Sequence, residues 1–381
     1  MTAQARSLIE AWRYLPSDLL LHVLPLHHIH GTINALFTPL MAGAAVEFAY
    51  PYNADVVWKR LAAPFLPHAP PVKRPITFLT LVPTIYSRLL ASYATLDEDM
   101  KKAARTAISP ANLRLNISGS AALPTPTRAA WTKLSDGNVL LERYGMTEVG
   151  MALSCGLAFE DRVDGSVGWP LPTVDVRLVD TETGQVIKPG DEMGPDGKLR
   201  EGEIQLRGPT IFSEYFRNRK ATEEEFVQGD DDSGGKWFKT GDVAVRQMVP
   251  GTGQSDQFWA KGPMYFIRGR KSVDIIKTGA EKVSALEVER ELLSLPQVSE
   301  AAVVGVPSEQ WGQKVAAVVV LSSHGRLAGG RRGKPWGAMD MRRALKDRLA
   351  NYKIPQELRI VEHIPRNAMG KSKSLVLPFE P

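Results

Sequence analysis

The stretch ITFLTLVPTIYSRLLASY, residues 76–93, decides which fold class this sequence predicts. Residues 76–82 form a β-branched apolar run, which is typical of a buried strand. Pro83 follows at once, and a helix tolerates proline at its first position, so we expect a helix over residues 83–93. Strands that alternate with helices indicate an α/β fold with a parallel sheet. The same alternation recurs on both sides, with strands expected at residues 19–24 and 113–118 and helices at 32–41 and 126–134.

The first residues predict an amphipathic helix rather than a secretory signal. Leu8, Ile9, Trp12 and Leu15 are spaced to lie on one helical face. The segment lacks both the apolar core and the small-residue cleavage site of a signal peptide.

The pattern changes after about residue 165. Short alternating strands separated by turn residues predict a smaller β-rich part, and two polar, glycine-rich stretches within it are expected to be surface insertions. The strands are expected at residues 175–179, 202–206 and 242–246, and the insertions at 228–236 and 249–262.

A second α/β pattern follows Arg270. Ser284 and Glu287 have the spacing of a capping box at the start of a helix. We therefore predict an α/β protein with a large domain over residues 1–268 and a mobile, small α+β domain over 271–381. The large domain divides into an α/β part (1–164) with a parallel sheet and a β-rich part (165–268). Further elements of the small domain are expected as strands at 301–306, 315–321 and 357–361 and a helix at 340–351.

Composition excludes several classes of protein. Of 381 residues, 43% are apolar and 23% are charged, which is the usual balance of a globular protein with more than one domain. No run of apolar residues is long enough to span a membrane. The single Cys155 cannot form an internal disulfide, which favours an intracellular location, mitochondrial or cytoplasmic. A net charge of +5 favours anionic ligands such as nucleotides, but it is too scattered to indicate nucleic acid as a partner.

The segment LLERYGMTEVG, residues 140–150, places polar groups after a predicted strand. Ligands of α/β sheets bind at such carboxyl ends. Tyr144 can stack on a planar ring, Thr147 can donate to a phosphate, and Glu148 is an oxygen ligand suited to Mg²⁺. An ordinary strand exit with solvated charges is the alternative interpretation.

Three further segments carry candidate groups. In the predicted turn WFKTGD, Asp242 could accept both hydroxyls of a ribose or could satisfy its own turn, and Arg270 could bind ribose or phosphate or form a surface ion pair. Lys371 lies on a glycine turn that fails to match a Walker loop, yet its charge could neutralise a phosphate. His28 and His30 could line a substrate pocket, bind a metal or hold the structure.

In this order, the motifs resemble the adenylate-forming superfamily of acyl-CoA synthetases, luciferases and peptide-synthetase adenylation domains. The closest likeness is to malonyl-CoA synthetases, especially the mitochondrial eukaryotic members. The matching segments are LPLHHIHG (24–31), SGSAALP (118–124), ERYGMTE (142–148), GEIQLRGP (202–209), WFKTGD (237–242), IRGRKSVDIIKTGAEKVSALEVE (267–289) and IPRNAMGK (364–371).

The resemblance implies a two-step reaction with ATP, Mg²⁺ and coenzyme A. A carboxylate attacks the α-phosphate of ATP, and the thiol of coenzyme A then displaces AMP from the acyl-adenylate. Lys371 would be the catalytic lysine, Thr147 would contact phosphate and Glu148 would hold Mg²⁺. Asp242 and Arg270 would hold the ribose, and the junction at residues 270–272 would be the hinge of the small domain. The other nucleotide residues would be Ser118, Gly119, Ser120, Ala121, Ala122, Tyr144, Gly145 and Lys277, and those facing coenzyme A would be Thr278, Gly279 and Ala280.

Arg143 is the residue that indicates which carboxylic acid is the substrate. A guanidinium beside the acyl pocket cannot pair with an apolar acyl chain. It can form a planar, bidentate ion pair with the second carboxylate of a diacid substrate. His28 or His30 would complete this pocket, and malonate is the expected acid. An ion pair of Arg143 with Glu142 or Glu148 is the alternative interpretation.

Two departures from the superfamily bear on activity. No segment matches its Ser/Thr/Gly-rich phosphate loop, and Ala280 stands where a second glycine is usual. We expect this chain to cover about the last two thirds of a family member, and we expect its adenylation activity to be weak or absent. The other hypotheses are a non-catalytic nucleotide- or acyl-binding remnant, a regulatory partner of a full-length synthetase, or a ligase for another acid. The sequence does not indicate an oligomeric state.

Overall fold

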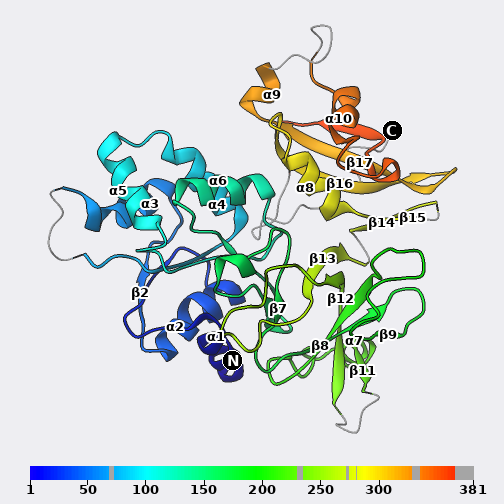
Figure 1. Cartoon of the computed structure of the whole chain (residues 1–381), viewed down its shortest axis with the longest axis horizontal. Helices are drawn as coiled ribbons and strands as arrows, with labels where there is room; N and C mark the ends of the chain where they lie inside the picture. Colours follow the sequence, from blue (N-terminus) through cyan, green and yellow to red (C-terminus); the bar gives the residue numbers. More distant parts are fainter. Residues whose placement is uncertain (68–72, 230–234, 272–273, 280, 328–334, 365–381) are drawn as a thin grey trace. The chain divides into compact units, whose positions relative to one another are not determined.

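A computed structural model describes residues 1–67, 73–229, 235–271, 274–279, 281–327 and 335–364. The chain forms two compact units, which are described separately (Figure 1). The first comprises residues 1–123, 127–240 and 245–267, and the second comprises residues 124–126, 241–244 and 268–381. Among the described residues, no helix has both the length and the apolar character needed to cross a membrane.

A seven-stranded sheet forms the centre of the first unit, in the order β2-β1-β3-β4-β5-β6-β7. Neighbouring strands from β2 to β5 pair in parallel, whereas β6 and β7 continue the sheet in antiparallel pairing. The predicted α/β class with a parallel sheet is therefore confirmed. The strands are β1 (Leu19–His22), β2 (Ala45–Phe48), β3 (Phe78–Leu81), β4 (Leu115–Ser118), β5 (Leu141–Met146), β6 (Gly150–Ser154) and β7 (Trp169–Pro170).

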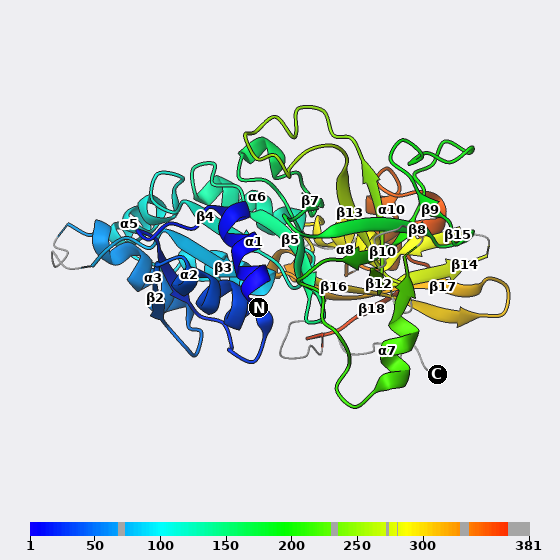
Figure 2. The same ribbon diagram turned by 90° about the horizontal axis from the view of Figure 1, so that it is seen from below.

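Helices cover both faces of this sheet, with α3 to α6 on one face and α1 and α2 on the other (Figure 1, Figure 2). The helix predicted at 83–93 has these bounds in the structure. The one predicted at 32–41 begins earlier, as a π-helix in which the Thr38 N–H donates to Ile33 O, and it continues as α2 with Pro39 in the first turn, where proline is tolerated. The helices are α1 (Thr2–Trp12), η1 (His30–Phe37), α2 (Thr38–Met41), α3 (Ala54–Ala62), α4 (Pro83–Tyr93), α5 (Glu98–Ile108) and α6 (Thr125–Leu134).

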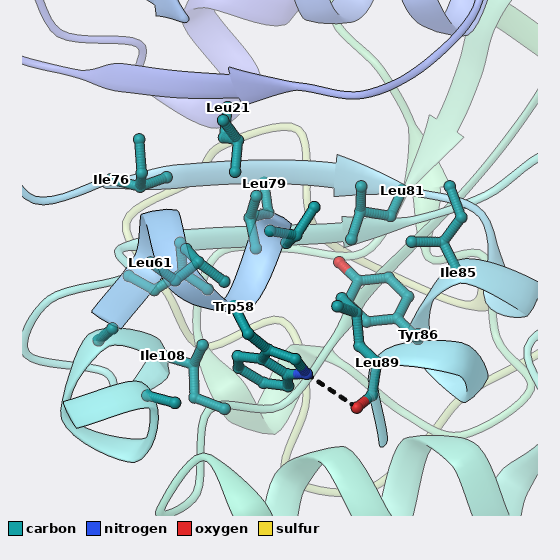
Figure 3. Close-up of a cluster of buried hydrophobic side chains, with 14 of the residues drawn as sticks. Leu21, Trp58, Leu61, Ile76, Leu79, Leu81, Ile85, Tyr86, Leu89 and Ile108 are labelled. Carbon is teal, nitrogen blue, oxygen red and sulfur yellow. Dashed lines mark hydrogen bonds between the residues drawn. The ribbon is translucent and has the colours of Figure 1, made fainter. Parts of the chain in front are cut away.

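An apolar core lies between the sheet and helices α3 to α6 (Figure 3). Trp58 is fully buried there, and its indole N–H donates to Leu89 O at 3.0 Å. The ring of Tyr86 meets that of Trp131 edge-on, with 4.8 Å between the centroids. Because Leu89 O accepts the indole N–H of Trp58 and the large rings bury apolar surface, this core holds the helices against the strands.

The β-rich part of the first unit has the strand order β11-β12-β10-β8-β9, and β13 pairs with β12. One sequence prediction fails here. WFKTGD is not a turn, because it lies inside the long strand β12, where Gly241 adopts a φ of +71°. At the ends of the first expected insertion, Gln228 pairs with Lys236, and residues 230–234 between them lie outside the described residues. The strands are β8 (Asp175–Asp180), β9 (Val186–Ile187), β10 (Gly202–Arg207), β11 (Phe226–Gln228), β12 (Lys236–Gln247) and β13 (Met264–Arg270).

The second unit is a small α+β assembly with the strand order β15-β14-β17-β16, in which β18 pairs with β17. Ser284 caps α8 by accepting a hydrogen bond from Glu287 N at 3.1 Å, as predicted. The other half of the predicted capping box is wrong, because the Glu287 carboxylate binds Lys353 at 2.8 Å instead. The elements are β14 (Ile275–Thr278), β15 (Glu281–Ser284), α8 (Ala285–Leu293), β16 (Val298–Ser308), β17 (Gly312–Leu321), α9 (Ser323–Leu327), α10 (Ala338–Leu345) and β18 (Glu357–Ile360).

Candidate functional site

The segment ERYGMTE lies on a β-hairpin rather than at a strand exit. Strand β5 continues through Arg143 and Gly145 to Met146 and pairs with β6 in antiparallel register. A Cβ atom on Gly145 would stand 2.2 Å from Gly150 O, so only glycine lets the two strands approach this closely. The hairpin turn presents an exposed Thr147 and a half-buried Glu148.

Helix α1, at the start of the sequence, binds strand β6 of this hairpin through two side chains. The Gln4 carboxamide oxygen accepts a hydrogen bond from Met151 N at 2.8 Å, and the Trp12 indole donates to Ser154 Oγ at 2.9 Å. Sequence reasoning missed Gln4, because no local pattern marks a side chain that caps a strand more than a hundred residues away.

Arg143 is a buried cation that has no carboxylate partner in the described part of the chain. Its side chain is 4% exposed, and its guanidinium packs on Gly119, where a Cβ atom would stand 2.4 Å from Arg143 Cζ. Nη2 donates to Ser120 Oγ at 3.5 Å, and Nε has no acceptor. Burial lowers the pKa of Arg143 to about 9. The ion pair with Glu142 or Glu148 that we considered does not form among these residues.

His30 meets Arg143 at the same hydroxyl. His30 Nδ1 lies 3.2 Å from Ser120 Oγ, and Nε2 lies 2.6 Å from Thr80 Oγ1. Burial, and secondarily the charge of Arg143, lowers the pKa of His30 well below its usual value. His30, Ser120 and Arg143 therefore form one polar cluster, in which His30 contacts Thr80 of β3, Ser120 follows β4 and Arg143 lies on β5.

The other histidines of the motif lie outside this cluster. His28 packs on His27, with 4.1 Å between ring centroids, and its Nε2 has no hydrogen-bond partner in the part of the chain that the structure describes. Burial lowers the pKa of His28 as well. Within the described residues, no group of three or more His, Cys, Asp or Glu side chains could hold a metal ion. The histidine motif thus supplies His30 to the cluster, whereas among the described residues no hydrogen bond joins His28 to it.

Protonation of His30 is expected to make folding stability depend on pH. The folded pKa lies below the unfolded value near 6.5, so the unfolded chain binds a proton first as the pH falls. Stability should therefore decrease as the pH drops below about 6.5, by up to ~1.4 kcal/mol per pH unit for this residue. His30→Gln should flatten the slope measured by urea unfolding between pH 7.5 and 5.5, whereas an unchanged slope would contradict this assignment. Burial also lowers the pKa values of His22 and His28, so a smaller slope should remain in the variant.

Tyr14 is a further residue of this region that the sequence analysis missed. We expected Leu15 on the buried face of the first helix, but α1 ends at Trp12, and Leu15 is 45% exposed. Tyr14 is buried instead, and its hydroxyl donates to Asn34 O at 3.0 Å on the π-helix. Because the chain leaves helical geometry at Arg13, whose φ is +50°, the helical spacing no longer predicts which side chain is buried.

Glu148 is held by the β-rich part of the same unit. The Tyr215 hydroxyl donates to Glu148 Oε1 at 3.2 Å, and Phe212 N donates to Glu148 O at 2.8 Å. A single half-buried carboxylate fits Mg²⁺, which binds proteins through one or two carboxylates and otherwise through water and substrate phosphates.

The predicted nucleotide loop lies beside this hairpin. Ser118 ends β4 and pairs with Glu142 of β5, so residues 118–122 leave the sheet next to Tyr144. Ser118 and Gly119 are buried, whereas Ala121 and Ala122 are exposed and Ser120 adopts a φ of +70°. The Ser118 hydroxyl is buried and has no hydrogen-bond partner among the described residues. The structure therefore brings the loop and Tyr144 to one edge of the sheet.

The remaining candidates belong to the second unit. Arg270 Nε lies 3.2 Å from Asp242 Oδ1, so the two predicted ribose ligands form an ion pair. Lys277 is exposed, Thr278 is 7% exposed, and Gly279 N donates to Trp311 O at 2.8 Å. Lys371, Ala280 and Ser272 lie outside the described residues.

Two surface hollows contain none of these candidates. One, of about 360 Å³, is lined by Tyr93, Lys102 and Thr106 on α4 and α5, and another, of about 310 Å³, is lined by Met339, Arg342 and Ile354.

Comparison with known families identifies the class of protein. Residues 1–216 match the model of the AMP-binding enzyme family, and residues 287–371 match the AMP-binding enzyme C-terminal domain. The chain therefore belongs to the AMP-binding enzyme family.

Its relatives are longer proteins. A CoA ligase of Gibberella moniliformis is 59% identical, over 97% of this chain and 63% of that protein. A protein of Mus musculus named malonate–CoA ligase ACSF3, mitochondrial, is 41% identical, over 97% of this chain and 59% of that protein. The crystal structure of ATP-bound MatB from Rhodopseudomonas palustris has a TM-score of 0.74 at 32% identity, covering 99% of this chain and 62% of that one. The chain thus spans about three fifths of the length of these relatives.

Proposed function

We propose that this chain carries acyl- and nucleotide-binding residues of an ATP-dependent acid–CoA ligase, and that its acid is a small dicarboxylate, with malonate the expected substrate. The relatives named CoA ligase and malonate–CoA ligase support the reaction class and the acid. A mitochondrial location is proposed from the name of the mouse relative.

The reaction proceeds in two displacements. A carboxylate oxygen attacks the α-phosphorus of ATP, and the bond to pyrophosphate breaks to leave an acyl-adenylate. The thiol of coenzyme A then attacks the acyl carbon, loses its proton and displaces AMP. The first step needs in-line placement and neutralisation of phosphate charge.

The residues take the following roles in this proposal. Thr147 and Lys371 contact the phosphates, and Glu148 would hold Mg²⁺, which neutralises phosphate oxygens when bound. Tyr144 and the loop 118–122, with Gly145, bind the adenine, while Asp242 and Arg270 exchange part of their mutual ion pair for the ribose hydroxyls. Rotation of the second unit at residues 270–272 brings Lys371 for the first step and residues 277–280 for the second.

The observation that carries the choice of acid is the buried Arg143 guanidinium without a carboxylate partner. An unpaired buried cation is costly, and the second carboxylate of a diacid removes that cost. A monocarboxylic acid leaves Arg143 unpaired. A charge-assisted hydrogen-bonded pair is worth about 1.5–3 kcal/mol, which is about ten- to more than a hundredfold in affinity.

Ligand-dependent unfolding tests this proposal without requiring turnover. Malonate should raise the unfolding temperature of the chain, by the equivalent of about 2.7 kcal/mol at a hundredfold excess over its Kd, whereas propionate should not. Gly119→Ala should weaken the malonate response, because the new Cβ occupies the position of the guanidinium. Equal responses to malonate and propionate would refute the dicarboxylate assignment. Malonate-dependent exchange of pyrophosphate into ATP separates the ligase from a non-catalytic binding protein.

A further inference from the structure

Two hydrogen bonds from one segment converge on Glu148. The Tyr215 hydroxyl donates to the carboxylate oxygen Oε1 at 3.2 Å, and the backbone N–H of Phe212 donates to Glu148 O at 2.8 Å. Both donors come from the connection between β10 and α7 (Arg219–Glu225), which follows the hairpin turn by more than sixty residues. The backbone hydrogen bond fixes the position of Glu148, and the side-chain hydrogen bond fixes the orientation of its carboxylate.

The donor segment is itself held on two sides. Phe212 meets Tyr215 at 4.8 Å, Phe226 at 5.3 Å and Phe238 at 5.1 Å between ring centroids. Tyr215 N donates to Thr222 Oγ1 at 2.9 Å in the first turns of α7. Because aromatic packing and a helix start both restrain Tyr215, its hydroxyl reaches Glu148 from a preset direction.

We propose that Tyr215 is a positioning residue for Mg²⁺: its hydroxyl orients the Glu148 carboxylate so that the second oxygen, Oε2, is presented to the cation. This inference rests on the proposed role of Glu148. Carboxylates that bind metals are usually hydrogen-bonded in turn, and losing such a partner typically lowers metal affinity or activity by about 10- to 100-fold. Phenol is a suitable donor because it stays protonated at neutral pH and adds no charge to compete with the metal.

A purely structural role for Tyr215 makes a different prediction. If the ring alone mattered, as a member of the aromatic cluster, then removing the hydroxyl would leave metal dependence unchanged. Tyr215→Phe keeps the ring and its contacts with Phe212 and removes only the donor to Glu148. The variant therefore separates the two roles.

The experiment is isothermal titration of the full chain with ATP at increasing Mg²⁺, together with AMP in the presence of EDTA. Tyr215→Phe should raise the Mg²⁺ concentration for half-maximal ATP binding about 10- to 100-fold and leave the Kd for AMP unchanged. Glu148→Gln should shift the Mg²⁺ dependence at least as far. Tyr93→Phe is the matched control, because it removes a hydroxyl that donates to Lys101 O at 3.2 Å on a distant helix, and it should behave as wild type.

Each other result overturns a defined part of the inference. A Mg²⁺ requirement of Tyr215→Phe within twofold of wild type refutes the positioning role and leaves the proposed function standing. Parallel losses of AMP binding and thermal stability in Tyr215→Phe refute it in favour of a structural role. ATP binding by the wild-type chain that does not respond to Mg²⁺ refutes the role of Glu148 itself, and the positioning role with it.

Discussion

Replacing Arg143 with methionine is expected to raise the unfolding temperature of the unliganded chain and to remove its response to malonate. The guanidinium is 4% exposed, has no carboxylate partner among the described residues, and makes one long hydrogen bond, to Ser120. Replacing buried charged groups with apolar side chains of similar size often stabilises a protein by about 1–4 kcal/mol. Methionine has a similar unbranched shape and no charge to desolvate.

Arg162→Met is the matched control for this prediction. Arg162 is also buried, at 3% exposure, but its guanidinium donates to Val139 O at 2.5 Å and to Leu157 O at 2.7 Å. Its removal leaves the partly buried carbonyl oxygens of Val139 and Leu157 without these donors, so we expect destabilisation by about 1–3 kcal/mol. Thermal unfolding with and without malonate measures both variants. A loss of stability in Arg143→Met as large as that in Arg162→Met would show that Arg143 is structural.

Replacing Asp18 with asparagine is expected to destabilise the first unit by about 3 kcal/mol at pH 7. Asp18 is 2% exposed, and its carboxylate accepts hydrogen bonds from Leu15 N at 2.8 Å, Thr77 Oγ1 at 2.9 Å and the guanidinium of Arg114. These contacts tie the start of β1 to the segments that lead into β3 and β4. The amide keeps the shape but leaves Arg114 without its counter-charge. Urea unfolding at pH 7 measures the effect.

The pH dependence of this difference follows from the pKa of Asp18. Burial alone would raise that pKa, but hydrogen bonds from Arg114 and Leu15 N outweigh it and lower the pKa below the usual value. The stabilisation is therefore complete above about pH 4, the unfolded pKa, and is lost as the pH falls through the folded pKa. Asp256→Asn is the control, because its carboxylate is 75% exposed in its pair with Arg13 and should matter little. An equally large effect of both substitutions would contradict the argument.

Local patterns in the sequence were sufficient to predict the strands and helices that form the scaffold. The apolar run before Pro83 predicted both a buried strand and the bounds of α4, because propensity and a proline act over a few residues. The order of the motifs was sufficient to identify the family, and two models of that family match the chain. Ser284 could likewise be recognised as a helix cap, because its partner Glu287 N is three residues away.

Predictions failed where a distant segment decided the local conformation. The glycine of WFKTGD indicated a turn, yet the segment lies inside the long strand β12, which pairs with β10, β11 and β13. The leucines before ERYGMTE indicated the end of a strand, but β6 extends β5 through Gly145. In both cases interstrand hydrogen bonds outweigh the turn preference of a single glycine.

The sequence by itself determined the alternation of strands and helices, the family, and which residue types could bind a nucleotide and a diacid. Only the tertiary structure decided that Arg143 has no counter-charge in the described part of the chain, that His30 meets it at Ser120, and that Tyr215 orients Glu148. The physical reason is that secondary structure depends on neighbours a few residues away. Desolvation and hydrogen-bond partners, in contrast, depend on groups that lie many residues apart in the chain and meet only when it folds.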